Sequence, residues 1–351
     1  MEALWSYMKR RKELRTWIQA IGIGLVMIGL ALYCLSRGII SVPIETAWRV
    51  LETAAMGTRE PDVIGDVIYY LRLPRFLLAL AAGCGLAVCG CVMQAVLRNG
   101  LADPYLMGIS SGAGAGAVGA IVLGIGSWHG VELVGLFAFL GALAFAGAIV
   151  LAARWMGKAN ELGILLCGMA LNAVGSAVVS LMVSLFSDTE GIQNITYWLM
   201  GSLQRATFLQ AGIIGALVLA GTAFFVCRGR VLNMMLAGEE AALTLGYDIN
   251  GARQKYILLV AVLVGSIVCV SGMIGFVGLV IPHIVRMVTG SNHFRLLPIS
   301  AVCGAVFLAA ADLAGRTWLD GVEVPIGIIV SLVGAPAFVG LLVRQAYRRE
   351  V

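Results

Sequence analysis

Charged residues are scarce in this chain of 351 residues: Asp, Glu, Lys and Arg together make up 12%, while 60% of the residues are hydrophobic. A soluble protein carries roughly one quarter charged residues, so a soluble enzyme held by a single anchor is excluded. Nine stretches lack any Asp, Glu, Lys or Arg and have lengths at or near that of a membrane crossing. These are residues 17–36, 76–97, 104–131, 133–153, 162–187, 206–227, 256–285, 296–311 and 324–343. An all-α polytopic membrane protein is predicted, with one transmembrane domain over residues 1–351.

Lysine is rare as well, with Lys9, Lys12, Lys158 and Lys255 as its four occurrences. None of them lies in the Gly-x-x-x-x-Gly-Lys-Ser/Thr pattern, whose backbone and lysine bind nucleotide phosphates. The chain therefore carries no ATPase site of that kind, and we expect that it is not itself an enzyme.

The charge-free runs also lack the carboxylates that carriers coupled to protons or sodium ions usually need at mid-membrane. A partner that supplies the energy is the economical hypothesis. Two alternatives stay open on these observations: an ion-coupled secondary transporter of a small organic solute, and a membrane scaffold or binding protein without transport.

Residues that ligate metals are few and scattered. The eight cysteines lie almost entirely in apolar runs, and the close pair Cys89 and Cys91 has one residue between the thiols, which is not zinc-site spacing. The three histidines, His129, His283 and His293, have no second ligand nearby in sequence, so structural roles are favoured. We expect no metal site and no cofactor in this chain, and disulfides are not implied.

The number of crossings depends on residues 256–285, a charge-free run of thirty residues. As one helix it would be about 45 Å long at ~1.5 Å per residue, whereas a bilayer core is about 30 Å thick. Because the run contains Gly272, Gly275, Gly278 and Pro282, we predict a break and two helices. Ten crossings then place 17 Lys and Arg in inner segments and 7 in outer ones, which predicts cytoplasmic N- and C-termini.

The predicted helices have approximate bounds, and two other segments stand out. Gly108, Gly112 and Gly116 recur every four residues, which is typical of close helix packing in membranes. Residues 192–204 are too short to cross and are predicted to lie across the outer face or to re-enter it. The ten helices are predicted at 17–36, 76–97, 105–127, 133–153, 162–187, 206–227, 256–274, 276–290, 297–315 and 324–344.

The long inner loop, residues 228–253, divides at Gly238. Leu232, Met235 and Leu236 share one face of a short helix. A second short helix is predicted to start at the acidic pair that follows Gly238 and to end at Gly246. These apolar side chains suit either a groove on a partner or the inner leaflet of the membrane, and the pattern does not separate the two.

Several motifs in order give the chain a strong resemblance to the FecCD-type permeases of bacterial ABC importers, which take up iron–siderophore complexes, haem or cobalamin. The likeness covers roughly residues 17–346. It is carried by RLPR at 72–75, QAVLRNGLADP at 94–104, LAGEEAALTLG at 236–246, GFVGLVIPHIVR at 275–286, ADLAGR at 311–316 and GAPAF at 334–338.

The resemblance implies a protomer of ten helices in the bacterial cytoplasmic membrane that pairs with a second copy or a close paralogue. The substrate path lies between the two protomers. Two cytoplasmic subunits bind ATP and Mg and drive transport, and an extracytoplasmic binding protein delivers the substrate. Nucleic acid is not among the expected partners. The expected cargo is an iron siderophore or haem, with cobalamin less favoured.

The resemblance also implies site residues. Residues 230–246 form the cytoplasmic coupling loop, and the inner gate contains Asn99 and Leu101. Gly100 stands where the family usually has proline, which puts the rigidity of that gate in doubt because glycine is more permissive in backbone angles. Docking of the binding protein is assigned to Arg72, Arg75 and Arg316, which lie at outer helix ends against an acidic background. The ATPase contact is assigned to Leu232, Met235, Leu236, Gly238, Glu239, Glu240, Leu245 and Gly246.

Overall fold

The computed structural model describes residues 24, 26–38, 40–125, 127–128, 131–155, 161–186, 189–238, 242, 244, 246–319 and 321–350. The regular secondary structure of this part of the chain is helical apart from a pair of two-residue antiparallel strands, β1 (Ser127–Trp128) and β2 (Val131–Glu132). An N-terminal apolar helix spans Val26–Ser36. The others are α2 (Ile44–Met56), α3 (Val63–Asp66), η1 (Val67–Arg72, a π-helical turn), α4 (Leu73–Val96), α5 (Ile109–Val122), α6 (Leu133–Trp155), α7 (Glu161–Phe186), α8 (Thr189–Met200), α9 (Phe208–Cys227), α10 (Gly229–Ala237), α12 (Ile249–Ser271), α13 (Val277–Thr289), α14 (His293–Thr317) and α15 (Ile326–Glu350).

Six helices of the described part are long and apolar enough to cross a bilayer: Val63–Val96, Leu133–Trp155, Glu161–Leu185, Phe208–Cys227, Ile249–Ser271 and His293–Thr317. Four shorter apolar helices accompany them: Val26–Ser36, Ile109–Val122, Val277–Thr289 and Ile326–Leu341. These helices overlap the ten sequence-predicted segments one for one, so the all-helical membrane fold is confirmed. The number of crossings stays a prediction, because a helix of 13 residues such as α13 is only about 20 Å long.

Of the helix starts that differ from the sequence prediction, three have clear local reasons. The helix predicted to start at residue 76 is continuous from Val63, since Asp62 caps it by accepting a hydrogen bond from the Gly65 amide. The helix predicted to start at residue 256 begins at Ile249, where Asp248 caps it. The helix predicted over 105–127 is shorter and begins at Ile109, because Gly108 has a left-handed backbone.

The predicted break within residues 256–285 is confirmed. α12 ends at Ser271, α13 begins at Val277, and Gly272 and Phe276 both have positive φ angles, +65° and +63°. An ideal Cβ on Gly272 would collide with the Trp198 carbonyl oxygen. This non-helical backbone is therefore enclosed by protein, which is the condition for irregular backbone within a membrane domain.

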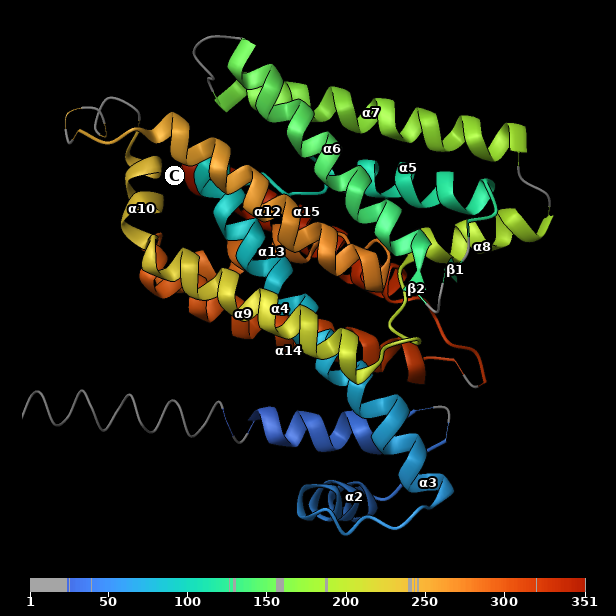
Figure 1. Ribbon diagram of the computed structural model, residues 1–351. Coiled ribbons are helices and arrows are strands. Elements are labelled where there is room, and N and C mark those ends of the chain that lie inside the picture. Colours follow the sequence, from blue (N-terminus) through green and yellow to red (C-terminus); the bar gives the residue numbers. More distant parts are fainter. Residues whose placement is uncertain are drawn as a thin grey trace, which may run out of the picture.

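α4 runs through the middle of the bundle, between the pair α9 and α14 and the pair α12 and α13 (Figure 1). Small residues allow these close crossings: an ideal Cβ on Gly90 would overlap the Gly278 carbonyl of α13, and one on Gly83 would overlap the Gly304 carbonyl of α14. The predicted close packing of the glycine series on α5 is also confirmed, because Gly112 and Gly116 face the backbone of α6.

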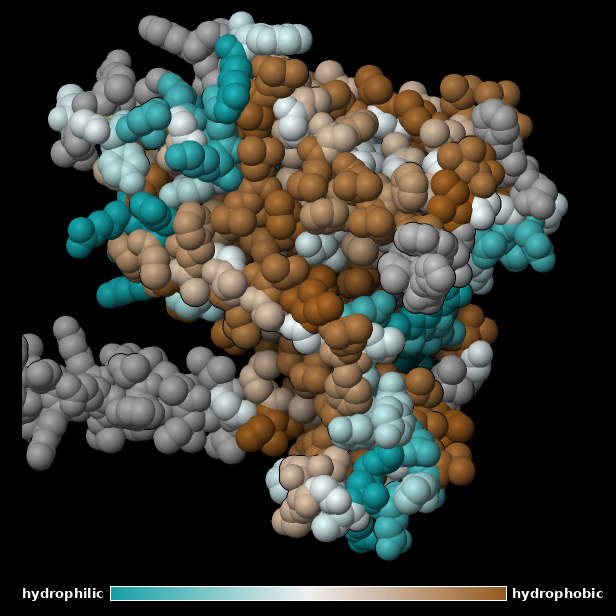
Figure 2. Space-filling view, in the orientation of Figure 1, coloured by the Kyte–Doolittle hydropathy of each residue, from teal (hydrophilic) through white to brown (hydrophobic). Residues whose placement is uncertain are grey.

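Two polar ends flank a wide hydrophobic belt, which Figure 2 shows as brown side chains across the middle of the molecule. One end carries α10, the turn after α4 and the C-terminus, and we call it the α10 end (Figure 1). The opposite end carries α2, α3, α8 and the connection between α14 and α15, and we call it the α2 end. Each end contains one group of the residues that the sequence singled out.

Candidate functional site

The turn after α4, residues 97–103, contains the predicted gate residues; we call it the gate turn, and it lies at the α10 end. Asn99 holds its shape: the Asn99 Oδ1 atom accepts a hydrogen bond from the Leu101 amide at 2.9 Å, and the Asn99 carbonyl accepts one from Ala102 at 3.0 Å. Leu101 is 38% exposed. Arg98, the second residue of the turn, has a φ angle of +46°, which is in the left-handed region that residues with a Cβ seldom adopt.

Arginine side chains tie the gate turn to neighbouring helices. Arg253 of α12 is fully buried and donates from Nε to the Val96 carbonyl, the last of α4, at 3.1 Å. Its Nη2 atom donates to Glu161 Oε1, at the start of α7, at 2.8 Å. The same carboxylate oxygen lies 3.6 Å from Arg98 Nη1. One carboxylate thus connects the gate turn, α7 and α12.

On its other side the gate turn faces α13. Arg286 donates from Nη2 to the Gln94 side-chain oxygen at 2.8 Å, which links α13 to the last turn of α4. An ideal Cβ on Gly100 would lie 3.8 Å from Arg286 Nη1 and 3.9 Å from His283 Nδ1, both ordinary contact distances. Position 100 therefore has room for a side chain. The effect of Gly100, in place of the family's usual proline, on the rigidity of the gate stays a prediction.

The coupling residues that the sequence proposed differ in how deeply the structure buries them. Leu232 and Met235 are buried against the core and Leu236 is half-buried, because α10 packs this face on α4 and α14. The expectation that these side chains are presented to a partner is therefore wrong for Leu232 and Met235: they fill an internal contact. Gly238 ends α10 with a φ angle of +114°. Glu239, Glu240 and Leu245 lie outside the described residues.

A cavity of about 360 Å³ lies beside the coupling loop. Gly246, with a φ angle of +72°, forms part of its wall. Phe224 of α9 and Lys255 and Tyr256 of α12 also line it, together with Arg228, Tyr247 and Asp248 from the segments outside these helices. Among the described residues of the loop region, Arg230, Ala237, Thr244 and Gly246 are exposed, so they and this hollow are open to a partner.

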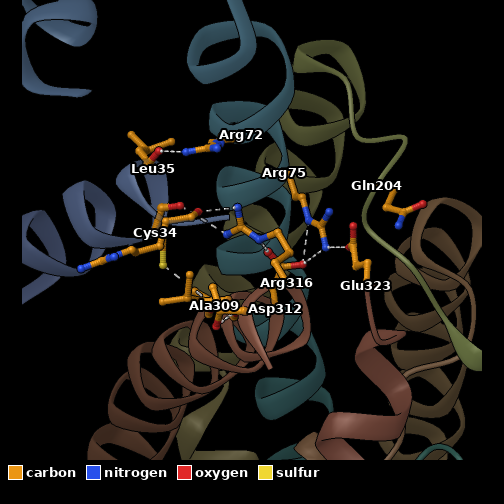
Figure 3. Close-up of polar contacts among 12 residues, drawn as sticks. Cys34, Leu35, Arg72, Arg75, Gln204, Ala309, Asp312, Arg316 and Glu323 are labelled. Carbon is orange, nitrogen blue, oxygen red and sulfur yellow. Dashed lines mark hydrogen bonds and ion pairs between the residues drawn. The ribbon is translucent and has the colours of Figure 1, made fainter. Parts of the chain in front are cut away.

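At the α2 end, Arg75 and Arg316 share Asp312 in a polar network, and Arg72 lies beside it and binds Leu35 (Figure 3). Arg75 donates from Nε to Asp312 Oδ1 at 2.8 Å and also binds Glu323. Arg316 Nε lies 3.1 Å from Asp312 Oδ2, so one aspartate pairs with two arginines. Figure 3 draws Asp312 between the two guanidinium groups.

The same network holds the end of the N-terminal helix. Arg72 donates to the carbonyl oxygens of Leu35 at 2.7 Å and Ile40 at 2.5 Å. Arg316 donates to the carbonyl oxygens of Cys34 and Arg37, both at 3.4 Å. Two of these acceptors, on Cys34 and Leu35, belong to the last turn of the helix, where carbonyl oxygens have no partner within the helix.

The three arginines are buried, although they lie at helix ends. Arg72, Arg75 and Arg316 are 7%, 8% and 6% exposed, and Asp312 is 1% exposed, so the Asp312–Arg316 pair is buried as well. The sequence could not show this, because an arginine at a helix end has the same pattern whether water or a neighbouring helix covers it. Docking of a binding protein by these residues stays a prediction.

Within the described residues, no group of three or more His, Cys, Asp or Glu side chains could hold a metal ion. His293 is buried at the start of α14, where its amide donates to the Asn233 side-chain oxygen at 2.9 Å and its Nδ1 atom lies 2.7 Å from the same oxygen. Its position therefore fits the structural role that its sequence context favoured.

The FecCD transport family matches residues 25–344, nearly the whole chain. The chain belongs to this family. It is 38% identical to the hemin transport system permease protein HmuU of Yersinia pestis over 331 residues, which covers 93% of this chain and 95% of HmuU. It is 37% identical to the vitamin B12 import system permease protein BtuC of Vibrio cholerae over 323 residues, which covers 92% of each chain.

A solved structure of a metal-chelate type ABC transporter in an inward-facing conformation has the same fold as this FecCD protein. The TM-score is 0.78 at 32% identity, and the match covers 92% of this chain and 98% of the other. The family resemblance drawn from the sequence motifs is thereby confirmed, and the relatives named are transport components rather than enzymes. Sequence reasoning missed Glu161, Arg253, Gln94 and Arg286, whose partners are far from them along the chain.

Proposed function

We propose that this protein is the permease subunit of an ATP-driven importer of a metal chelate, with an iron siderophore or haem favoured over cobalamin. The observation that carries the proposal is the match to the FecCD family over residues 25–344, joined to 38% identity with a hemin permease over almost the full length of both chains. The relatives transport different chelates, so the choice among them rests on experiment.

The chemistry of the chain supports a chelate over a bare ion. A free Fe or Mn ion would have to lose water and be coordinated by side chains on its way. The charge-free runs contain no Asp or Glu, and the described residues offer no cluster of metal ligands. A bulky preformed chelate needs neither dehydration nor coordination by side chains. An apolar path with few ligands can admit such a chelate and release it equally easily.

The proposed assembly has two permease copies, two cytoplasmic ATP-binding subunits and an extracytoplasmic binding protein. Most of the surface of α7 is uncovered: 17% of its 18-residue apolar stretch is buried, compared with 78% of the corresponding stretch in Val63–Val96. Lipid and the second copy are the proposed neighbours of that surface. In this proposal ten crossings place both termini and the α10 end in the cytoplasm, in keeping with the excess of Lys and Arg in the inner segments.

The α10 end is the proposed site of both the ATPase contact and the inner gate. Residues 230–246 would contact the ATPase through the exposed side of α10, Gly238, the acidic pair Glu239 and Glu240, and the hollow beside Gly246, while Leu232 and Met235 transmit motion by packing on α4 and α14. Asn99 and Leu101 would form the constriction of the path between two copies.

Uptake in proteoliposomes tests the function. The permease, purified with its ATPase subunits and supplied with a binding protein, is expected to accumulate at least one of haem, a ferric siderophore or cobalamin in an ATP-dependent way. Free Fe and Mn ions should enter far more slowly. A protonophore serves as the control and should leave uptake unchanged. Uptake that follows an ion gradient without ATP would favour a secondary transporter, and rapid uptake of the free ions would exclude the apolar chelate path.

Arg72 donates to carbonyl oxygens, which carry no net charge, whereas Arg75 and Arg316 pair with carboxylates. The positive charge of Arg72 is therefore the best test of docking at the α2 end. We expect Arg72→Gln to slow association of the binding protein by roughly two- to fivefold, the range for a weak ion pair, and to reduce its salt dependence. Surface plasmon resonance at low and high salt measures both. Arg49→Gln, an exposed arginine on α2, is the matched control. Equal rates for the two variants at both salt concentrations would contradict docking at Arg72.

A further inference from the structure

Arg98 lies between two sites that the proposed function treats separately. Its backbone lies in the gate turn, next to Asn99, and its side chain extends to the end of α10. An ideal Cβ on Gly238 would lie 3.4 Å from Arg98 Nη2 and 3.6 Å from Arg98 Cζ. Because Gly238 has no side chain, the guanidinium lies directly against the backbone of the coupling loop at the point where α10 ends.

The edge of the guanidinium at Nη1 faces Glu161, whose Oε1 atom lies 3.6 Å away. Glu161 is itself fixed, since the buried Arg253 donates to it at 2.8 Å and holds the last carbonyl of α4 at the same time. The carboxylate thus limits how Arg98 can move when the coupling loop shifts. A displacement of Gly238 would act on a side chain whose Nη1 atom also faces this carboxylate, and the side chain would pass it to the backbone of the gate turn.

The backbone of Arg98 supports the same interpretation. Its φ angle of +46° is one of two positive values among the non-glycine residues described. Such conformations cost free energy and persist where the surroundings enforce them. A residue with this backbone, whose partly exposed side chain contacts Gly238 and lies 3.6 Å from Glu161, is suited to transmit a displacement.

We propose that Arg98 is the positioning residue that links movement of the coupling loop at Gly238 to the gate turn at residues 97–103. This inference rests on the proposed function, in which the loop contacts the ATPase and Asn99 and Leu101 form the gate. A competing route exists in the direct packing of Leu232 and Met235 on α4 and α14, and the experiment below separates the two routes.

A spin label at the gate turn reports its movement without knowledge of the chelate. The label is attached to Leu101→Cys in a Cys227→Ser background, which removes the exposed native thiol, in the permease–ATPase complex reconstituted in nanodiscs. Label mobility is recorded with and without ATP. The rate of ATP hydrolysis is measured on the same sample. A complex that lacks Leu101→Cys gives the background signal.

With Arg98 present, ATP is expected to change the spectrum of the label. Arg98→Ala should reduce the responding fraction roughly tenfold, within the range of about 5- to 150-fold for coupled sites, while ATP hydrolysis persists and shows that the complex is assembled. Arg98→Lys should give an intermediate response, since it keeps the charge facing Glu161 without the planar guanidinium. Arg154→Ala, an exposed arginine of α6 bound to Gln254, is the matched control and should respond like the parent.

Two outcomes overturn the proposal in distinguishable ways. A full response in Arg98→Ala shows that helix packing alone moves the gate, and it overturns the role of Arg98 while leaving the proposed function intact. No response in the parent, despite active ATP hydrolysis, overturns the gate and coupling assignments and the inference with them. If Arg98→Ala does not assemble, Arg98→Gln replaces it and the same comparison decides.

Discussion

Asp312→Asn is expected to lower the free energy of unfolding by about 3–5 kcal/mol, the usual effect of removing one partner from a buried ion pair. Asp312 is 1% exposed and pairs with Arg75 and Arg316, both nearly buried. The asparagine variant leaves Glu323 as the carboxylate partner of Arg75 and leaves Arg316 bound to carbonyl oxygens. Unfolding in mixed detergent micelles, followed by circular dichroism, measures the change.

A matched variant separates burial from charge. Asp66 pairs with Arg59 at 2.6 Å at the same end of the molecule, but its side chain is 46% exposed. We expect Asp66→Asn to have a much smaller effect, because water solvates the remaining arginine and screens the pair. Equal effects of the two variants would contradict the role of burial in the Asp312 network.

Gly90→Ala is expected to separate α4 from α13. An added Cβ would overlap the backbone of Gly278, and backbone atoms cannot rotate away as a side chain can. Overpacking of this kind costs about 1–3 kcal/mol, and the displaced α13 carries Arg286, which binds Gln94 beside the gate turn. Both the free energy of unfolding and transport in proteoliposomes are expected to fall.

Gly212→Ala on α9 is the control, because nothing lies within 4 Å of its added Cβ. This variant is expected to match the parent or to be slightly more stable, since alanine favours a helix more than glycine does. A stable, active Gly90→Ala protein would show that α4 and α13 are not held at the distance described.

The positions of the helices follow largely from the sequence, because a charge-free run of membrane length has few other ways to fold. The break between α12 and α13 was predictable for the same reason: thirty apolar residues exceed the bilayer core, and Gly272 supplies the backbone freedom that the interruption needs. Helix starts were predicted less well. Asp62 and Asp248 cap helices that extend beyond the apolar runs, into residues whose polarity suggested loops.

Composition, run length and motifs were enough to establish the class of protein, the order of its helices and its family. The tertiary structure decided which charges meet. Asp312 pairs with Arg75 across 237 residues and Arg253 with Glu161 across 92, and both pairings depend on which helices become neighbours. The tertiary structure also turned the apolar face of α10 inward. An amphipathic pattern fixes which face is buried, but the choice between covering it with the chain itself or with a partner depends on packing that local sequence does not contain.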